Sequence, residues 1–234
     1  MAVPLRHELK FYISYPQYLT LRSNLRHLLH QDPNAARNGG EYAIRSLYFD
    51  TEFNTAYYDK INGVKDRDKY RIRIYNYSDR DIFMECKTKV GAFISKRSVK
   101  IPRSLADQLT AGDPAGLEFT TSGLLRDVYR EMRLNLLRPV VIVDYDREAY
   151  IHPAEDVRIT FDKNVRTGLN SVDMFNDRVP TLPVMDHGEM ILEVKYNRIL
   201  PSYIRDILNT YCQGALPSAI SKYTWCRRFE EKEA

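Results

Sequence analysis

The chain has 234 residues, 44% of them hydrophobic, which is enough apolar material for one substantial core, so we expect a single domain over residues 1–234. Its 35 lysines and arginines nearly balance its 31 aspartates and glutamates, and this modest excess does not by itself indicate nucleic-acid binding. The three cysteines, Cys86, Cys212 and Cys226, are far apart in the sequence and support neither a disulfide framework nor a zinc site. The first residues lack the long apolar segment of a signal peptide, and no apolar run reaches the ~18 residues that a membrane span needs. We therefore expect a cytoplasmic protein.

The first hundred residues alternate between strand and helix patterns. Apolar residues recur at helical spacing after the first strand, and later runs alternate apolar and charged residues as strands do. The expected elements are a strand over 5–13, a helix over 15–29, a loop over 31–40, a strand over 42–50, a short helix over 52–60, and three antiparallel strands over 69–77, 81–89 and 93–101.

The second half continues the mixture of helices and strands. We expect helices over 102–110 and 121–136, strands over 139–150 and 156–165, an irregular loop over 166–188, a strand over 189–196, and helices over 201–211 and 217–230. Eight strands with helices between them indicate an α+β fold.

Charged residues lie two positions apart in six of the strand-like stretches, so that they share one face of each strand while apolar residues occupy the other. A solvated sheet face also alternates in this way, but it usually mixes both signs of charge. Here 11 cations accompany 4 acids: Arg6, Lys10, Arg71, Arg73, Lys87, Lys89, Lys96, Lys100, Arg147, Arg158 and Lys195 against Glu8, Glu85, Asp162 and Glu193. If the sheet closes with this face inward, its lumen is a positive channel suited to a polyanion.

A nucleic-acid binder is the competing interpretation of such a face. It would place aromatic side chains among the cations to stack on bases, and Tyr70 and Phe83 do not share the cationic face, although Tyr75 continues it. We therefore expect no nucleic-acid partner.

Eight motifs in order resemble a known family: RHELKF, SLYFDT, KYRIRIY, ECKTK with KRSVK, VDYDREAY, VRITFD, ILEVKY and SKY. They are similar to the catalytic domain of the vacuolar transporter chaperone (VTC) polyphosphate polymerases, within the triphosphate tunnel metalloenzyme group. The resemblance runs from Arg6 to Tyr223. It implies an antiparallel eight-stranded β-barrel with flanking surface helices, whose basic interior holds a triphosphate or a polyphosphate chain.

The resemblance also implies the roles of particular residues. Metal-binding carboxylates would be Glu193 and Glu8, and oxygen ligands suit Mn²⁺ or Mg²⁺. Phosphate-binding residues would be Lys10, Arg71, Arg73, Lys87, Lys100, Tyr145, Arg147, Arg158, Ser221 and Lys222, of which Arg71, Arg73, Lys87, Arg147 and Arg158 would be catalytic. The chain departs from the family at Ala219, where polymerases tend to have a lysine.

Three functions remain open at this point. The leading hypothesis is a metal-dependent polyphosphate polymerase that transfers the γ-phosphoryl group of ATP to a polyphosphate chain. The alternatives are a tripolyphosphate or triphosphate hydrolase of the same fold and a non-catalytic polyphosphate-binding module. Expected partners are ATP or another triphosphate and polyphosphate, and a membrane partner protein is compatible with a chain that has no membrane segment of its own.

Overall fold

The computed structural model describes residues 6–91, 93–154, 156–212 and 218–233, with only the backbone of the last two. Its centre is one antiparallel sheet with a path of eight strands in the order β1-β10-β8-β7-β3-β4-β5-β6. These strands are β1 His7–Ser14, β3 Tyr42–Asp50, β4 Arg67–Tyr75, β5 Ser78–Val90, β6 Phe93–Lys100, β7 Arg138–Ile151, β8 Arg158–Thr167 and β10 Glu189–Tyr196. The prediction of an α+β fold around eight antiparallel strands is confirmed.

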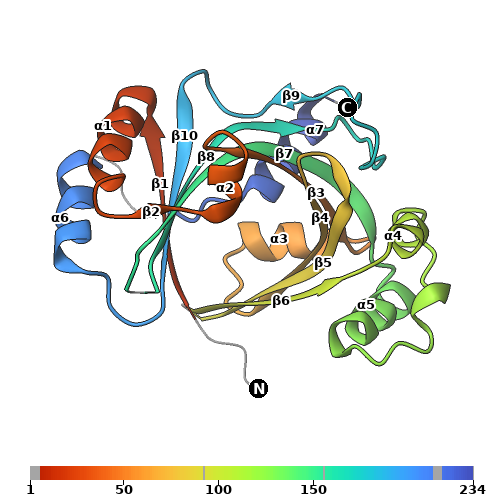
Figure 1. The fold of residues 1–234 in the computed structure, drawn as a ribbon. Helices are drawn as coiled ribbons and strands as arrows, with labels where there is room; N and C mark the ends of the chain where they lie inside the picture. Colours follow the sequence, from red (N-terminus) through yellow and green to blue (C-terminus); the bar gives the residue numbers. More distant parts are fainter. Residues whose placement is uncertain (1–5, 92, 155, 213–217, 234) are drawn as a thin grey trace.

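The sheet curls into a half-barrel whose two edge strands approach each other (Figure 1). Arg6 and Ile94 form an isolated bridge between these edges, with backbone N–H to carbonyl distances of 3.1 and 3.2 Å in the two directions. The bridge brings β1 and β6 together at one end of the curl, so the sheet encloses its concave face more completely than an open sheet would.

Seven α-helices and a short 3₁₀ helix flank the described part of the sheet. They are α1 Tyr15–Leu25, α2 Pro33–Arg37, α3 Thr55–Ile61, α4 Arg103–Thr110, the 3₁₀ helix Ala115–Leu117, α5 Gly123–Leu134, α6 Ser202–Tyr211 and α7 Lys222–Glu233. No helix in the described ranges has both the length and the apolar composition needed to cross a membrane.

Several predicted boundaries differ from the structure. The first helix ends at Leu25, and the chain continues through turns in which the Leu29 amide still donates to the Leu25 carbonyl at 2.8 Å. The predicted loop over 31–40 contains α2, a helix too short to show a period, which Asp32 caps by accepting from the Asn34 amide at 2.9 Å. The last helix begins at Lys222, whereas its predicted start at residue 217 lies outside the described residues.

The predicted irregular loop over 166–188 is only partly irregular. Strand β8 extends to Thr167, and β9 Leu182–Pro183 pairs with it, while β2 His30–Gln31 pairs with β7. The loop between β8 and β9 is anchored by the buried Arg45. Its guanidinium donates to the Asn176 carbonyl and forms a salt bridge of 2.8 Å with Asp144.

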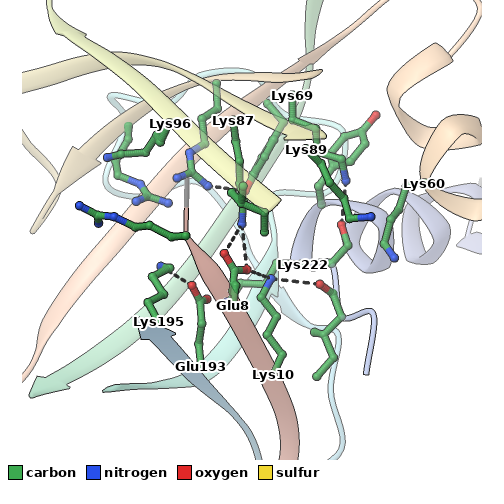
Figure 2. Close-up of a pocket in the computed structure, with 18 of the residues that line it drawn as sticks. Glu8, Lys10, Lys60, Lys69, Lys87, Lys89, Lys96, Glu193, Lys195 and Lys222 are labelled. Atoms are coloured by element: carbon green, nitrogen blue, oxygen red, sulfur yellow. Dashed lines mark hydrogen bonds and ion pairs between the residues drawn. The ribbon is translucent and has the colours of Figure 1, made fainter. Parts of the chain in front are cut away.

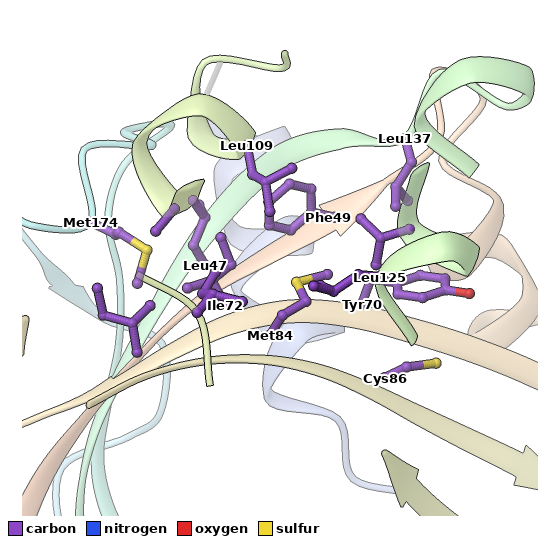
Figure 3. Close-up of a cluster of buried hydrophobic side chains, with 14 of the residues drawn as sticks. Leu47, Phe49, Tyr70, Ile72, Met84, Cys86, Leu109, Leu125, Leu137 and Met174 are labelled. Atoms are coloured by element: carbon purple, nitrogen blue, oxygen red, sulfur yellow. The ribbon is translucent and has the colours of Figure 1, made fainter. Parts of the chain in front are cut away.

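The outward faces of the strands carry two apolar layers. Helices α4 and α5 cover β4 and β5 in a cluster that includes Ile72, Met84, Leu109 and Leu125 (Figure 3). Helices α1 and α6 cover β1, β8 and β10 on the opposite flank in a second cluster around Leu25 (Figure 1). Apolar residues at every second position therefore pack outward under helices, which turns the intervening charged positions inward.

The concave face is not empty of apolar side chains. Tyr223 and Cys226 of α7, together with Ile220 just before it, pack against residues of β3, β7 and β8 in a third buried cluster. Helix α7 thus fills one part of the curl, and the remaining part is the cavity in which the candidate site lies.

Candidate functional site

The concave face of the sheet holds a cavity of about 550 Å³ (Figure 2). Strands β1, β3, β4, β5, β6, β7, β8 and β10 all contribute to its walls, with further residues from α3 and the start of α7. Its described lining contains 14 cations and two acids. The cations are Arg6, Lys10, Lys60, Arg67, Lys69, Arg71, Arg73, Lys87, Lys89, Lys96, Arg147, Arg158, Lys195 and Lys222, and the acids are Glu8 and Glu193.

A buried carboxylate of β5, opposite Arg71 in the strand register, orients neighbouring cations of β4 and β6. Glu85, which is 1% exposed, accepts from Arg71 Nε at 2.8 Å and from Lys96 Nζ at 2.7 Å, and Arg73 lies 3.7 Å away. Burial raises the pKa of Glu85, but the charges of Arg71, Arg73 and Lys96 outweigh burial and hold it below the ordinary value. Glu85 therefore stays ionised and fixes these side chains.

A second carboxylate performs the same task near β7, which is separated from β4 by β3 alone. Asp162 of β8 is fully buried and holds Arg147 through two parallel bonds of 2.6 and 2.7 Å, the bidentate arrangement that fixes a guanidinium most firmly. Lys222 at the start of α7 donates to the same carboxylate at 2.5 Å. Arg147 and Lys222 are thereby drawn together from different elements.

Tyr145 lies between these two groups of cations. Its hydroxyl accepts from Arg73 Nη2 at 3.0 Å, and the Arg147 guanidinium lies 5.2 Å from its ring centre. Burial opposes ionisation of this phenol, but the charges of Arg147 and Arg73 lower its pKa below the ordinary value. The cations in contact with Tyr145 therefore make this point of the cavity strongly positive.

The two acids of the lining lie on the neighbouring strands β1 and β10, where Lys10 is opposite Glu193 and Lys195 is opposite Glu8. Glu8 binds Lys10 at 2.8 Å and Lys87 at 2.7 Å, and Glu193 pairs with Lys195. Burial and the charge of Glu193 raise the pKa of Glu8, but its lysine neighbours bring it down to about 2. Burial also raises the pKa of Glu193, but the charges of Lys195, Lys10 and Lys87 outweigh burial and hold it well below the ordinary value, so both carboxylates are ionised at neutral pH.

The chemistry of this pair fits a divalent cation that is shared with a phosphate ligand. No group of three or more His, Cys, Asp or Glu side chains in the described ranges gathers at one point, so those residues do not form a complete metal cage. Mg²⁺ commonly binds one or two carboxylates and completes its shell with phosphate oxygens and water. The buried Thr160 Oγ1, on β8 opposite Glu193, finds no partner among the described residues and leaves a polar position open beside the pair.

The structure brings most of the predicted site residues together in the cavity wall. Those that line it are Glu8, Lys10, Arg71, Arg73, Lys87, Tyr145, Arg147, Arg158, Glu193, Ser221 and Lys222. Their functions remain proposals.

Lys100 was predicted to lie in the cavity with these residues, and the structure contradicts this position. Lys100 does not line the cavity; it is the last residue of β6, and its ammonium pairs with Asp81 at 2.6 Å with 59% of its side chain exposed. The alternation of charged and other residues along a strand predicts the face on which a side chain lies. It does not predict how far along the strand the cavity extends.

Sequence reasoning did not select several cations that line the cavity. Arg67 and Lys69 continue the spacing of Arg71 and Arg73 along β4, so the same alternation contained the signal for them. Lys60 reaches the cavity from α3, and no pattern in the sequence indicates that this short helix lies against the concave face.

Comparisons with known proteins address the fold and the family. A search of curated proteins gave no match. Among solved structures, HpAC1 from Hippeastrum, a candidate adenylyl cyclase with a dominant triphosphatase activity, has a TM-score of 0.59 at 14% identity and covers 97% of this chain and 96% of its own. A candidate adenylate cyclase from Bacillus halodurans has a TM-score of 0.56 at 14% identity, covering 93% and 95%.

These two likenesses concern the fold, because their sequence identities are low. The family model named VTC domain matches residues 5–229, which include every strand and all but the last turn of α7. The cationic cavity lies inside the region so matched. The chain therefore belongs to the VTC domain family and has the triphosphate tunnel fold.

Proposed function

We propose that the protein is a metal-dependent polyphosphate polymerase that transfers the γ-phosphoryl group of ATP to the end of a polyphosphate chain in the cationic cavity. The observation that carries the proposal is the cavity itself, in which the described lining has 14 cations and two acids, both on neighbouring strands. Enclosed cations of this number attract a polyanion strongly because little water screens them.

The reaction forms a bond between a terminal oxygen of the acceptor chain and the γ-phosphorus, and it breaks the bond from that phosphorus to the β–γ bridging oxygen, so that ADP leaves. Arg71 of β4 and Arg147 of β7, held by Glu85 and Asp162, present guanidinium groups to the phosphoryl oxygens from two different strands of the wall. Fixed cations stabilise the charge that develops in the transition state without having to reorganise.

The carboxylates of Glu8 and Glu193 would hold a Mg²⁺ or Mn²⁺ ion, which when bound neutralises charge on the phosphate oxygens. Lys87 bonds to Glu8, and burial lowers the pKa of Lys87 to about 8. Glu8 is also paired with Lys10, so two lysines occupy its carboxylate in the absence of a metal ion.

A hydrolase is the second candidate, and one observation favours it. HpAC1, which shares the fold, has a dominant triphosphatase activity, and the cavity residues that would position an acceptor phosphate would position water equally well. A polymerase and a hydrolase are distinguished by their products, which are polyphosphate and free phosphate. Incubation of the purified protein with ATP and Mn²⁺, followed by separation of long polyphosphate from free phosphate, should give polyphosphate, whereas free phosphate alone would establish the hydrolase.

The variant Glu193→Gln tests the metal assignment. It keeps the volume of the side chain but removes the charge that would hold the cation, so turnover at saturating Mn²⁺ should fall by about a hundredfold or more while polyphosphate still binds. Glu189→Gln, an exposed position on the same strand, is the matched control and should keep its activity. Undiminished turnover in Glu193→Gln would place the metal elsewhere.

A further inference from the structure

The cations of the cavity fall into two groups that differ in their partners. Nine form a salt bridge with an aspartate or glutamate: Lys10, Arg71, Arg73, Lys87, Lys96, Arg147, Arg158, Lys195 and Lys222. Within the described ranges, five lining cations form none: Arg6, Lys60, Arg67, Lys69 and Lys89. Arg6 lies at the bridge between β1 and β6, and the other four lie together where α3 meets β4 and β5. We refer to Lys60, Arg67, Lys69 and Lys89 as the α3-side cluster.

Strand register brings like charges of the α3-side cluster directly opposite each other. Arg67 of β4 is the partner of Lys89 of β5, and Lys69 is the partner of Lys87 one step further along. Like charges at directly opposed positions destabilise a sheet. Lys87 is outside the cluster and is bonded to Glu8, so the negative charge that a ligand would supply is missing at Arg67, Lys69 and Lys89.

Nearby acids do not neutralise the α3-side cluster. Asp66, which directly precedes β4, accepts from the Gly91 amide, and Asp68 of β4 accepts from Thr88 Oγ1. Asp59 attracts Arg67 electrostatically, but the two side chains form no salt bridge. Burial and then the charges of Arg67, Lys10, Lys60 and Lys87 lower the pKa of Lys69, which agrees with an uncompensated positive environment.

Lys69 also connects the α3-side cluster with the start of α7. Its ammonium donates to Ser221 Oγ at 3.0 Å and lies 4.9 Å from the centre of the Tyr223 ring (Figure 2). Along β4 it stands between Arg67 and Arg71, and four cations at every second position make a row about 20 Å long at the usual rise of a strand. The cluster and the carboxylate-containing part of the cavity therefore form one continuous track.

We propose that the α3-side cluster is a second anion subsite, which binds phosphates of a condensed chain that extend beyond the carboxylate-containing part, and does so without a metal ion. The inference rests on the proposed function, since it assumes a phosphate chain in the cavity. With no carboxylate to hold a divalent cation, the subsite neutralises phosphate by lysine and arginine alone. It gives the protein a preference for chains longer than a triphosphate.

The double variant Lys69→Met with Lys89→Met tests this subsite, since methionine keeps an apolar stem and loses the charge. Dissociation constants for sodium tripolyphosphate and for a long-chain sodium polyphosphate are measured by calorimetry, in EDTA and in Mn²⁺. In EDTA the parent protein should bind the long chain at least about tenfold more tightly than tripolyphosphate, since one charge-assisted contact corresponds to roughly a decade. The double variant should lose this preference, with tripolyphosphate affinity changed less than about threefold.

Two further double variants serve as controls for the loss of charge and for the change of side chain. Arg26→Met with Arg37→Met removes two exposed charges that do not line the cavity and should behave like the parent protein. Lys69→Arg with Lys89→Arg keeps the charges and should retain the chain-length preference. The melting temperature checks that each variant folds.

Several results would overturn the inference. Equal loss of affinity for both ligands would make the α3-side cluster part of the triphosphate site, and no loss for the long chain would remove it from binding. Orthophosphate that displaces the long chain as effectively as tripolyphosphate does would identify a separate small anion as the occupant. Failure of the parent protein to bind tripolyphosphate even in Mn²⁺ would instead contradict the proposed function, so the two failures are distinguishable.

Discussion

Glu85 shows at the scale of one residue how a strongly positive cavity remains compatible with folding. Its carboxylate, buried on β5 beside β4, bonds to Arg71 and Lys96, so that cations which would otherwise repel each other share one counter-charge. Removing one member of a buried ion network is costly because the remaining charges stay buried without compensation. Glu85 is therefore expected to matter for stability as well as for the orientation of phosphate ligands.

The variant Glu85→Gln should reduce the free energy of unfolding at pH 7 by about 3 kcal/mol. Because the pKa of Glu85 is lower in the folded protein than in the unfolded chain, its stabilisation is complete above the unfolded value of about 4.3 and is lost as pH falls below it. The difference in stability between parent and variant, measured by urea denaturation, should therefore shrink between about pH 5 and pH 3.

A control separates this effect from general acid denaturation. Asp81→Asn removes a carboxylate that is 61% exposed in its pair with Lys100, and such pairs contribute little. Its stability should match that of the parent protein at every pH. A Glu85→Gln difference that stays constant down to pH 3 would mean that Glu85 is not the ionised counter-charge of this wall.

The alternation of Arg71 and Arg73 with apolar residues predicted the face on which they lie, since the period of a strand is two. The same rule extends to Lys69, the first residue of the KYRIRIY motif, although Lys69 is absent from the predicted phosphate-binding residues. It failed for Lys100, because the end of a strand leaves the cavity without any change of pattern. Partners such as Asp162 for Lys222 depend on a contact between elements 60 residues apart, which local patterns do not contain.

At the scale of elements, the helices divide the molecule into outer layers that stabilise the curl and an inner site that binds. Helices α1 and α6 pack on the outer side of β1, β8 and β10, and Leu25 of α1 is fully buried there. The charged side chains of the same strands line the cavity on the other side. Stability and ligand affinity should therefore respond separately to substitutions in the two layers.

Leu25→Ala should lower the free energy of unfolding by about 2 to 5 kcal/mol, because it removes a transfer contribution and leaves a cavity. The tripolyphosphate dissociation constant, measured by calorimetry below the melting temperature, should stay within about twofold of the parent value. Leu19→Ala, at a position of α1 that is 45% exposed, is the matched control and should cost less than about 0.5 kcal/mol. A large change in affinity for Leu25→Ala would show that the outer layer shapes the site.

Periodicity predicted most strands and the helices α4, α5 and α6 because each has a strong two-residue or 3.6-residue repeat. It did not predict α2, because this helix has only 5 residues and is too short to show a periodic pattern. It also gave no sign that α7 enters the concave side, because helix placement is decided by packing of Ile220, Tyr223 and Cys226 against distant strands.

At the scale of the whole molecule, the net charge of +4 conceals a strong separation of charge. The cavity gathers 14 of the cations with two acids, so most carboxylates lie elsewhere. The order of motifs along the chain predicted the family, whereas the bridge between Arg6 and Ile94 that closes one end of the curl could not be predicted from either edge strand alone.

The most direct test of the account is the binding of tripolyphosphate to the parent protein and to Arg71→Ala and Arg73→Ala, measured by isothermal calorimetry in Mn²⁺. Each guanidinium lies in the cavity wall, and a charge-assisted contact is worth roughly 1.5 to 3 kcal/mol, so each variant should raise the dissociation constant about tenfold or more. Arg26→Ala is the control on an exposed surface outside the cavity. Unchanged affinity in both cavity variants would contradict the assignment of this cavity as the phosphate site.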